Sequence, residues 1–289
     1  MILALALALA AQANPEAEMV MDHKRREAEK SAPAPKLSVD SKVLKSDFVR
    51  PSAMQQKFDA CLDAALDDPI AGAQRAEEWR MASGGYLARQ CLGFAYAQQQ
   101  RWLPAMTAFQ QAADEADVAG DPVSAQLWVQ AGNAALAGGN PENAQKYFDA
   151  ALAHGLADGL EKGEVHLDRA RALVAQDRLA DARQDIDLAL AQVPKDPLAW
   201  LLSATLARRM DNLALAQSHI AKALELASDD ASVALEEGNI AVLTGADDKA
   251  KLAWERAVKL APDSPAGTAA AHNLGQLAAQ AVTSAPASK

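Results

Sequence analysis

An alanine ladder is the dominant feature of this sequence of 289 residues. Five times an alanine is followed four residues later by a bulky apolar residue, and three residues after that by another alanine. Spacings of three and four residues place side chains on one face of a helix. The five triplets are Ala105–Phe109–Ala112, Ala144–Phe148–Ala151, Ala182–Ile186–Ala189, Ala216–Ile220–Ala223 and Ala250–Trp254–Ala257, and their first alanines lie 39, 38, 34 and 34 residues apart. A period of about 34 residues predicts stacked helical hairpins.

The composition favours the same fold class. Half of the residues are hydrophobic but only 4% are aromatic, and alanine supplies most of the apolar content. Alanine has the highest helix propensity and allows helices to approach closely. No segment shows the sustained alternation of apolar and polar residues that strands require. We therefore expect an all-α chain, and an alanine-rich helical bundle with loose periodicity is the alternative to stacked hairpins.

The motifs around the ladder resemble the tetratricopeptide repeat, which has a small residue in its first helix and Ala-x3-Phe in its second. The clearest match is Leu92-Gly93-x2-Tyr96 followed by Ala105-x3-Phe109. Later units have Trp128-x2-Ala131-Gly132, Ala170-x2-Leu173, Trp200-x3-Ala204 and Gly238-x2-Ala241, each followed by its triplet. The resemblance implies an α-solenoid with about five clear repeats over 86–262. A degenerate leading hairpin over 53–85 and a capping helix over 265–282 would complete it.

The spacing also predicts how each hairpin packs. We expect the small residue of the first helix to meet the alanine of the second helix where the two helices cross. The bulky residue would then fill the space between hairpins. The first two periods are longer than 34 residues, and the additional residues fall around Asp117–Ser124 and His154–Lys162. Glycine and proline are concentrated there, which predicts long connections between repeats.

The two ends of the chain have a different composition. Residues 1–13 form an apolar stretch that ends in Ala11-Gln12-Ala13, which predicts a signal peptide with an A-x-A cleavage site, although no Lys or Arg precedes it. The stretch is shorter than the ~20 residues of a membrane span, so no stable membrane insertion is expected after cleavage. Mixed charges and prolines predict a disordered linker over 14–52, and 283–289 is predicted to be a disordered tail. The solenoid would occupy 53–282, in the periplasm or otherwise exported.

The net charge of −10 is unevenly placed. Residues 1–50 hold 8 basic and 7 acidic residues, whereas the remainder holds 20 and 31. An acidic body repels phosphate backbones, so nucleic acid is not an expected partner. A solvated surface that aids solubility is the simplest explanation of this acidity.

The two cysteines, Cys61 and Cys91, lie 30 residues apart and form no CxxC motif. Neighbouring first helices of a helical-repeat stack lie side by side, so the two thiols could face each other. In an exported protein this predicts a disulfide. In a reducing compartment the two residues would be small buried hydrophobes.

No catalytic, metal-binding or cofactor-binding motif is present in the sequence, so we expect no enzyme, no metal and no cofactor. The nearest approach to a ligand cluster is Glu164-x-His166-x-Asp168, whose side chains spread around a helix and do not converge. Trp128, Trp200 and Trp254 fall at packing positions of the repeat, so we expect them in the core.

We expect the functional residues among the side chains that the alanine ladder does not use for packing. In tetratricopeptide proteins the first helices line a concave groove that receives a peptide or a helix, and the resemblance implies such a groove here. Asn133 and Asn239 each follow the glycine of their repeat, and an amide there can hold a peptide backbone. The predicted groove residues are Gln90, Asn133, Arg171, Arg208, Arg209 and Asn239. Ordinary solvated side chains on exposed helix faces are the alternative.

The function that follows is a non-enzymatic scaffold or adaptor in the bacterial envelope that binds protein partners. A glycan- or peptidoglycan-facing binding module is the alternative, which the low aromatic content disfavours. An enzyme would need a convergent pocket with histidine or paired carboxylates, and the spacing offers none.

Overall fold

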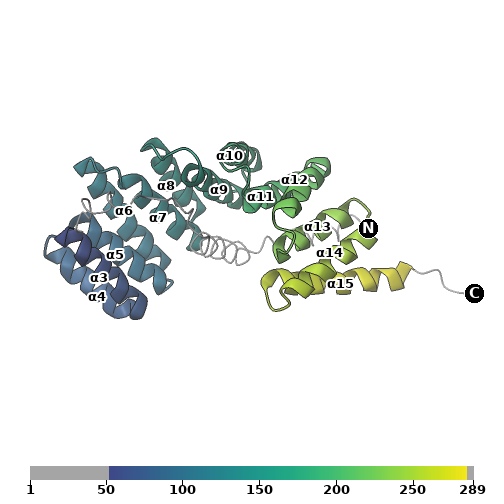
Figure 1. Cartoon of the computed structure of the whole chain (residues 1–289), viewed down its shortest axis with the longest axis horizontal. Coiled ribbons are helices and arrows are strands. Elements are labelled where there is room, and N and C mark those ends of the chain that lie inside the picture. The colour runs from purple at the N-terminus through teal and green to yellow at the C-terminus, as the bar shows by residue number, and fades with distance from the viewer. Residues whose placement is uncertain (1–51, 285–289) are drawn as a thin grey trace, which may run out of the picture. The chain divides into compact units, whose positions relative to one another are not determined.

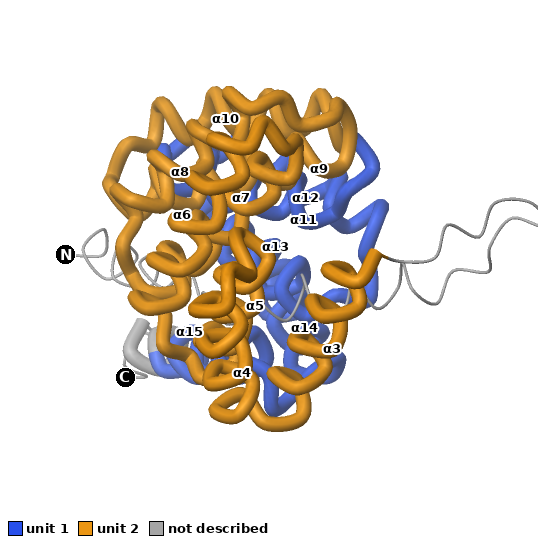
Figure 2. The backbone as a smooth tube through the Cα atoms, turned by 90° about the vertical axis from the view of Figure 1, so that its left-hand side faces the viewer, with its two compact units in different colours: residues 1–35, 194–289 blue, residues 36–193 orange. Residues whose placement is uncertain are grey.

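The computed structural model describes residues 52–284 and folds this range into thirteen α-helices, with no strand among them (Figure 1). They form two compact units, and the described residues of unit 2 are 52–193 and those of unit 1 are 194–284 (Figure 2). Unit 2 holds α3 (Ala53–Asp67), α4 (Pro69–Met81), α5 (Gly85–Gln98), α6 (Trp102–Ala119), α7 (Ser124–Ala137), α8 (Pro141–Ala153), α9 (Leu160–Ala175) and α10 (Leu179–Gln192). Unit 1 holds α11 (Pro197–Arg209), α12 (Leu213–Leu226), α13 (Ala231–Leu243), α14 (Asp247–Leu260) and α15 (Pro265–Ser284). Within each unit consecutive helices pack as hairpins, which confirms the predicted all-α solenoid.

The predicted signal peptide over 1–13 lies outside the described residues. The same holds for the predicted linker over 14–52, apart from Ser52, and for the predicted tail over 283–289, apart from its first two residues. Among residues 52–284, no helix combines the length and the apolar composition that a membrane crossing requires.

Several helices begin where the sequence supplies an acceptor side chain and a proline. Asp68 Oδ1 accepts the backbone N–H groups of the first turn of α4, and Pro69 is the first helical residue. The same arrangement opens α11 at Asp196 and Pro197. Asn140 caps α8, since its Oδ1 accepts the N–H of Asn143 at 3.3 Å. These acceptors satisfy amide groups that have no partner within the helix.

The turn inside each of the five clear hairpins contains one residue in the left-handed region. Glycine occupies this position in two hairpins, at Gly139 and Gly245, where the conformation is free of strain. In the other three it is taken by Gln100, Asp177 and Asp211, with φ between 56° and 59°. The repeated conformation makes each turn short and holds the two helices of the hairpin close together.

In three of the five clear hairpins a glycine of the first helix is covered by an aromatic ring of the second. A Cβ atom added to Gly93 would lie 2.7 Å from the ring of Phe109, and one added to Gly132 would lie 2.5 Å from that of Phe148. In unit 1 the indole of Trp254 lies over Gly238 in the same way. The nearest atoms to each of these glycines are those of the ring, a neighbour that the expected contact with an alanine did not include.

The same bulky residues also connect one hairpin to the next. Phe109 belongs to a buried cluster that includes Ala125 and Trp128 of the following hairpin. Ile220 likewise shares a cluster with Val233 of the hairpin after it. The prediction that the bulky position fills the space between hairpins is thus confirmed, and one side chain serves both contacts.

The first long connection is mostly helix. Most of the additional residues lengthen α6, which has 18 residues where α8 has 13. Only residues 120–123 remain between α6 and α7, and Tyr86 Oη donates to Asp121 Oδ2 at 2.6 Å to hold them. That hydrogen bond lowers the pKa of the Asp121 carboxyl. The second long connection, residues 154–159, is a true loop.

A disulfide joins Cys61 of α3 to Cys91 of α5, the pair expected from the sequence. Both residues are fully buried, in a small apolar cluster that also contains Ala76, Leu92 and Ala108. Phe58, Leu62 and Trp79 of the leading hairpin pack partly buried against this cluster. The bond therefore adds a covalent link to the packing of this hairpin on α5.

Removal of the disulfide by Cys61→Ala with Cys91→Ala should loosen the leading hairpin selectively. For a loop of 30 residues the chain-entropy model gives about 3–4 kcal/mol. Because hairpins in a stack depend mainly on their neighbours, hydrogen exchange should accelerate in α3 and α4 and stay unchanged in α9. Uniform acceleration throughout unit 2 would contradict this local role.

The same glycine-to-alanine change should have opposite effects at two helical positions. Gly132→Ala forces a methyl group against Phe148 and should destabilise the protein by about 1–3 kcal/mol. Gly275→Ala in α15 meets no atom within 4 Å, so the better helix propensity should stabilise by about 0.5–1 kcal/mol. Thermal unfolding of both variants checks the signs, and two destabilised variants would disprove the steric explanation.

Candidate functional site

In unit 2 the first helices leave one face uncovered by other helices. In α7 the opposite face is buried by Leu127, Trp128 and Ala131. The half-buried and exposed residues recur three or four positions apart, as one helix face requires. We call the uncovered face of α5 and α7 the first-helix stripe, and its members are Leu87, Gln90, Phe94, Ala97, Gln126, Val129, Gln130, Asn133, Leu136 and Ala137.

The first-helix stripe contains two of the six predicted groove residues. Gln90 Nε2 donates to Gln130 Oε1 at 3.2 Å, which links α5 to α7. Asn133 is half-buried, and its side-chain amide forms no hydrogen bond among residues 52–284. Phe94, Val129 and Leu136 pack partly against the core beneath and supply apolar surface between the amides. The stripe can therefore offer both amide groups and apolar contacts to a partner.

Arg171, the third predicted residue of unit 2, lies on α9. Its Nη1 donates to Asp168 Oδ1 at 3.0 Å, one turn back along the helix. The guanidinium thus already has a carboxylate beside it, and an incoming carboxylate would compete with Asp168 for it.

In unit 1 the predicted residue Arg208 forms a buried ion pair. Its Nε and Nη2 donate to the two carboxylate oxygens of Glu236 at 2.6 and 3.2 Å, which joins α11 to α13. Only 7% of Arg208 and 5% of Glu236 are exposed. Fork-shaped pairing of this kind neutralises both charges. The arginine that we expected to meet a partner therefore has a role within the fold.

Asn239 is also used inside unit 1. Its Oδ1 accepts hydrogen bonds from Trp254 Nε1 at 3.2 Å and from Asn273 Nδ2 at 3.1 Å. Its Nδ2 donates to Glu236 Oε2 at 3.1 Å. Asn133 occupies the equivalent place in unit 2, but its hairpin has Phe148 in place of tryptophan, and a phenyl ring has no N–H to donate. The buried ring, together with Glu236 and Asn273, thus distinguishes Asn239 from Asn133.

Arg209, the last predicted groove residue, is exposed at the end of α11.

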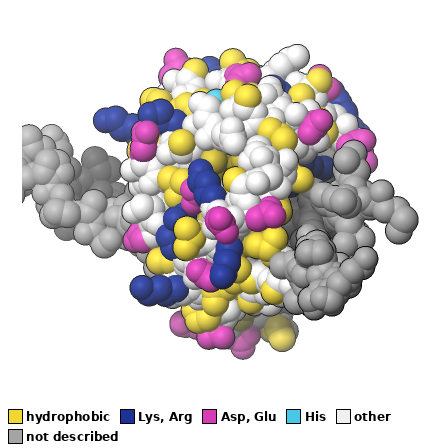
Figure 3. All heavy atoms as spheres, turned by 90° about the vertical axis from the view of Figure 1, so that its right-hand side faces the viewer, with side chains coloured by type: hydrophobic (Ala, Val, Ile, Leu, Met, Phe, Trp, Pro, Cys, Tyr) yellow, Lys and Arg dark blue, Asp and Glu magenta, His cyan; other side chains and the backbone are white. Residues whose placement is uncertain are grey.

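Charged side chains of both signs are interspersed over the face of the molecule drawn in Figure 3. That face therefore carries no broad basic surface of the kind that a phosphate backbone requires.

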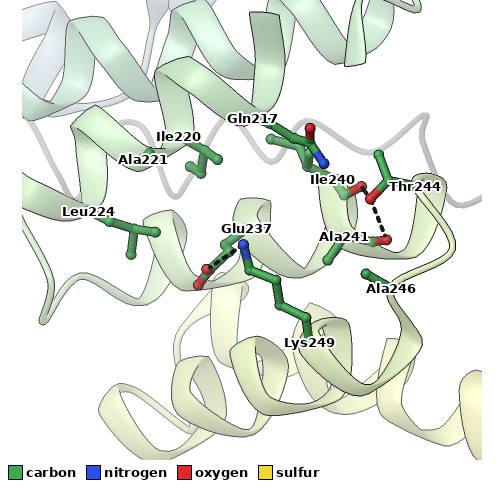
Figure 4. A pocket seen from close by; sticks show the side chains of 10 residues that line it. All are labelled: Gln217, Ile220, Ala221, Leu224, Glu237, Ile240, Ala241, Thr244, Ala246 and Lys249. Carbon is green, nitrogen blue, oxygen red and sulfur yellow. Dashed lines mark hydrogen bonds and ion pairs between the residues drawn. The ribbon is translucent and has the colours of Figure 1, made fainter. Parts of the chain in front are cut away.

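A shallow hollow lies between consecutive hairpins of unit 1 (Figure 4). Ile220 and Leu224 of α12 and Ile240 of α13 line it with apolar surface. Lys249 Nζ and Glu237 Oε1 form an ion pair across its rim at 3.5 Å. The Thr244 hydroxyl at the hollow donates to backbone carbonyls of α13, and Lys249 and Glu237 pair with each other, so the surface suits an apolar side chain better than a reaction.

The histidine of the candidate ligand cluster is used in packing. His166 Nδ1 lies 3.0 Å from Asp185 Oδ1 of α10, and Arg169 donates to both oxygens of the same carboxylate at 2.8 and 2.6 Å. Burial by itself raises the pKa of Asp185, but the hydrogen bonds from His166 and Arg169 outweigh it, and the pKa lies below its ordinary value. No group of metal-ligating side chains occurs among residues 52–284.

A serine and a histidine meet in unit 1, a pair that the sequence did not suggest. Ser203 Oγ and His219 Nδ1 are 2.6 Å apart, across α11 and α12. Ser203 is completely buried, so no substrate can reach its hydroxyl. The 16-residue separation follows from hairpin geometry and could have been found by aligning the two helices of each repeat.

Asp185→Asn should remove a pH-dependent part of the stability. Because the folded pKa lies below the unfolded value of about 3.9, the contribution is fully present above about pH 4 and is lost as the pH falls through the folded pKa. At neutral pH the variant should lose about 2–3 kcal/mol in urea unfolding, and the difference should shrink near pH 2.

The control is Asp187→Asn on the same helix, whose exposed pair with Arg183 should contribute less than about 1 kcal/mol. An equal loss for Asp185→Asn at both pH values would show that its charge is not responsible.

The fold has many similar solved structures, although no family model and no curated protein sequence matches the chain. The structure of PilW, described as a type IV pilus biogenesis factor, has a TM-score of 0.62 at 18% identity and covers 75% of this chain and 98% of its own. Pseudomonas aeruginosa pilF gives 0.59 at 14% identity, covering 77% and 100%. YrrB, a TPR protein with an unusual peptide-binding site, gives 0.50 at 17% identity, covering 68% and 95%.

These similarities agree with the repeated hairpins, the glycine under each aromatic ring and the 34-residue spacing of the later repeats. At this level of identity they show the fold alone. The described chain has the fold of the tetratricopeptide-repeat proteins.

Proposed function

We propose that the protein is a non-enzymatic scaffold that binds a segment of a partner protein along the first-helix stripe of unit 2. The observation that carries the proposal is the uncovered, half-apolar face of α5 and α7, on which the Asn133 amide forms no hydrogen bond among residues 52–284. An amide that is ordered by its helix and available to solvent can bind a peptide backbone through its donor and its acceptor.

The proposal favours unit 2 over the corresponding helices of unit 1. Arg208 and Asn239 already form hydrogen bonds with Glu236, so a partner would have to break a buried ion pair to use them. Breaking a buried pair costs about 3–5 kcal/mol, which a weak peptide complex cannot offset. Gln90 and Asn133 are therefore the leading candidates, with Arg171 beside them and Arg209 as a separate exposed cation.

The fold supports a binding role, because stacked hairpins commonly present extended binding surfaces. YrrB, one of the similar structures, is described as having a peptide-binding site. Trp128 and Trp254 are buried, and their indole N–H groups are bonded to Asp117 and Asn239, so these two rings offer no stacking face to a sugar. Together with the low aromatic content of the chain, this favours a protein segment over a glycan.

We place this activity in the bacterial envelope, as an exported protein. The apolar residues 1–13 followed by Ala-x-Ala favour a signal peptide. The buried disulfide between Cys61 and Cys91 fits an oxidising compartment, where such bonds persist. The charged, proline-containing segment 14–52 would connect the leader to the folded body.

Site-specific photocrosslinking tests the proposal. The photoreactive residue p-benzoylphenylalanine replaces Asn133 on the first-helix stripe or, as a matched control, exposed Lys146 on α8 of the same hairpin. In living cells the Asn133 position should give discrete crosslinked products with one partner protein, and the Lys146 position should not.

The measured quantity is the amount of crosslinked partner protein at Asn133 divided by the amount at Lys146. We expect at least about a tenfold excess of the partner at Asn133, since a bound segment contacts one face only. Equal labelling at both positions, or none at either, would refute the proposed binding face.

A further inference from the structure

The first-helix stripe carries no charged side chain, although it lies in the more charged of the two units. The described residues of unit 2 include 11 basic and 20 acidic side chains. Helix α7, from Ser124 to Ala137, contains none of them. Helix α5 contains one, Arg89, whose guanidinium is bonded to Glu115 and Gln111 of α6 and so lies off the stripe.

The absence of charged side chains is limited to the part of this face that α5 and α7 form. The next first helix, α9, has Glu164, Asp168 and Arg171 at the positions that continue the same face. Solubility is normally provided by charges on exposed faces, and the stripe instead offers amides and half-buried apolar side chains. Helix propensity does not explain the difference, because Lys and Glu form helices as well as Gln does and better than Asn.

The charge-free character restricts the ligand. A charged side chain pressed against the middle of the stripe would lose water and find no counter-ion, which is costly. The carboxylate of Glu161 at the α9 edge already accepts a hydrogen bond from Gln126 Nε2 at 3.0 Å. An apolar side chain would meet Phe94, Val129 or Leu136. The amides of Gln90, Gln130 and Asn133 would find partners only on a backbone with free N–H and C=O groups, which an extended chain has and a helix lacks.

We infer that the stripe binds an uncharged, extended peptide segment with apolar side chains. Helix axes that pack together are about 8–10 Å apart, and an extended chain advances about 3.3–3.6 Å per residue. A segment that crosses both α5 and α7 spans about two such helix widths. It therefore needs a run of about five or six residues without charge. This inference rests on the proposed function and specifies the chemistry of its ligand.

Selection from a phage-displayed library of random peptides, with the full-length disulfide-bonded protein as bait, tests the inference without a known partner. Enriched peptides should share an uncharged run of about five residues containing apolar side chains. Synthetic copies should bind with an affinity that changes less than about twofold between low and high salt, since no ion pair is formed.

Two isosteric variants of one hairpin provide the matched comparison. Asn133→Asp places a charge in the stripe and should weaken peptide binding at least about tenfold. Asn143→Asp makes the same chemical change in the first turn of α8, outside the stripe, and should leave binding unchanged. Thermal unfolding of both variants verifies that the fold is retained.

The two proposals fail in different ways. Enriched peptides that carry charges in their core, or that bind the Asn133→Asp variant as well as the wild type, would overturn the uncharged ligand and leave the scaffold proposal standing. If the wild type enriches no peptide and Asn133 gives no photocrosslink, both proposals are wrong.

Discussion

The contact between a small residue on one helix and a bulky residue on the next is the interaction on which the rest of the fold depends. Without a side chain at Gly93, Gly132 or Gly238, the ring of the second helix reaches the backbone of the first. The same ring then forms part of the surface on which the next hairpin packs. One bulky side chain thus holds the two helices of a hairpin together and also contacts the next element. Further hairpins can therefore be added with few sequence requirements beyond the small and bulky positions.

Most of the fold was predictable because it follows from local spacing. The ladder identified the five clear hairpins, and cap residues such as Asn140 marked where helices begin. The first long connection was mispredicted because helix propensity in residues 113–119 outweighed the expectation of a loop. The ring above each glycine was not predicted, because spacing along one helix does not reveal which residue of the partner helix lies nearest to it.

The site was less predictable than the fold. The sequence identified Asn133 and Asn239 as equivalent, but their hydrogen bonds differ, because Asn239 is bonded to Trp254, Asn273 and Glu236. The pairing of Arg208 with Glu236 joins the first helices of two consecutive hairpins. Such pairs form only where one side chain is long enough to reach a particular residue of another helix. The periodic pattern of a single sequence does not contain this information.

The exchange of phenylalanine for tryptophan at the bulky position has a wider consequence. In unit 1 the indole of Trp254 and the amide of Asn273 both donate to the side-chain oxygen of Asn239, whereas the phenyl ring of Phe148 has no N–H to offer Asn133. If Asn133 binds a partner as proposed, an interior residue that no ligand touches would contribute to which surface amide is available. A family of such proteins could diversify its recognition surface from within the core, while the exterior sequence stays constant.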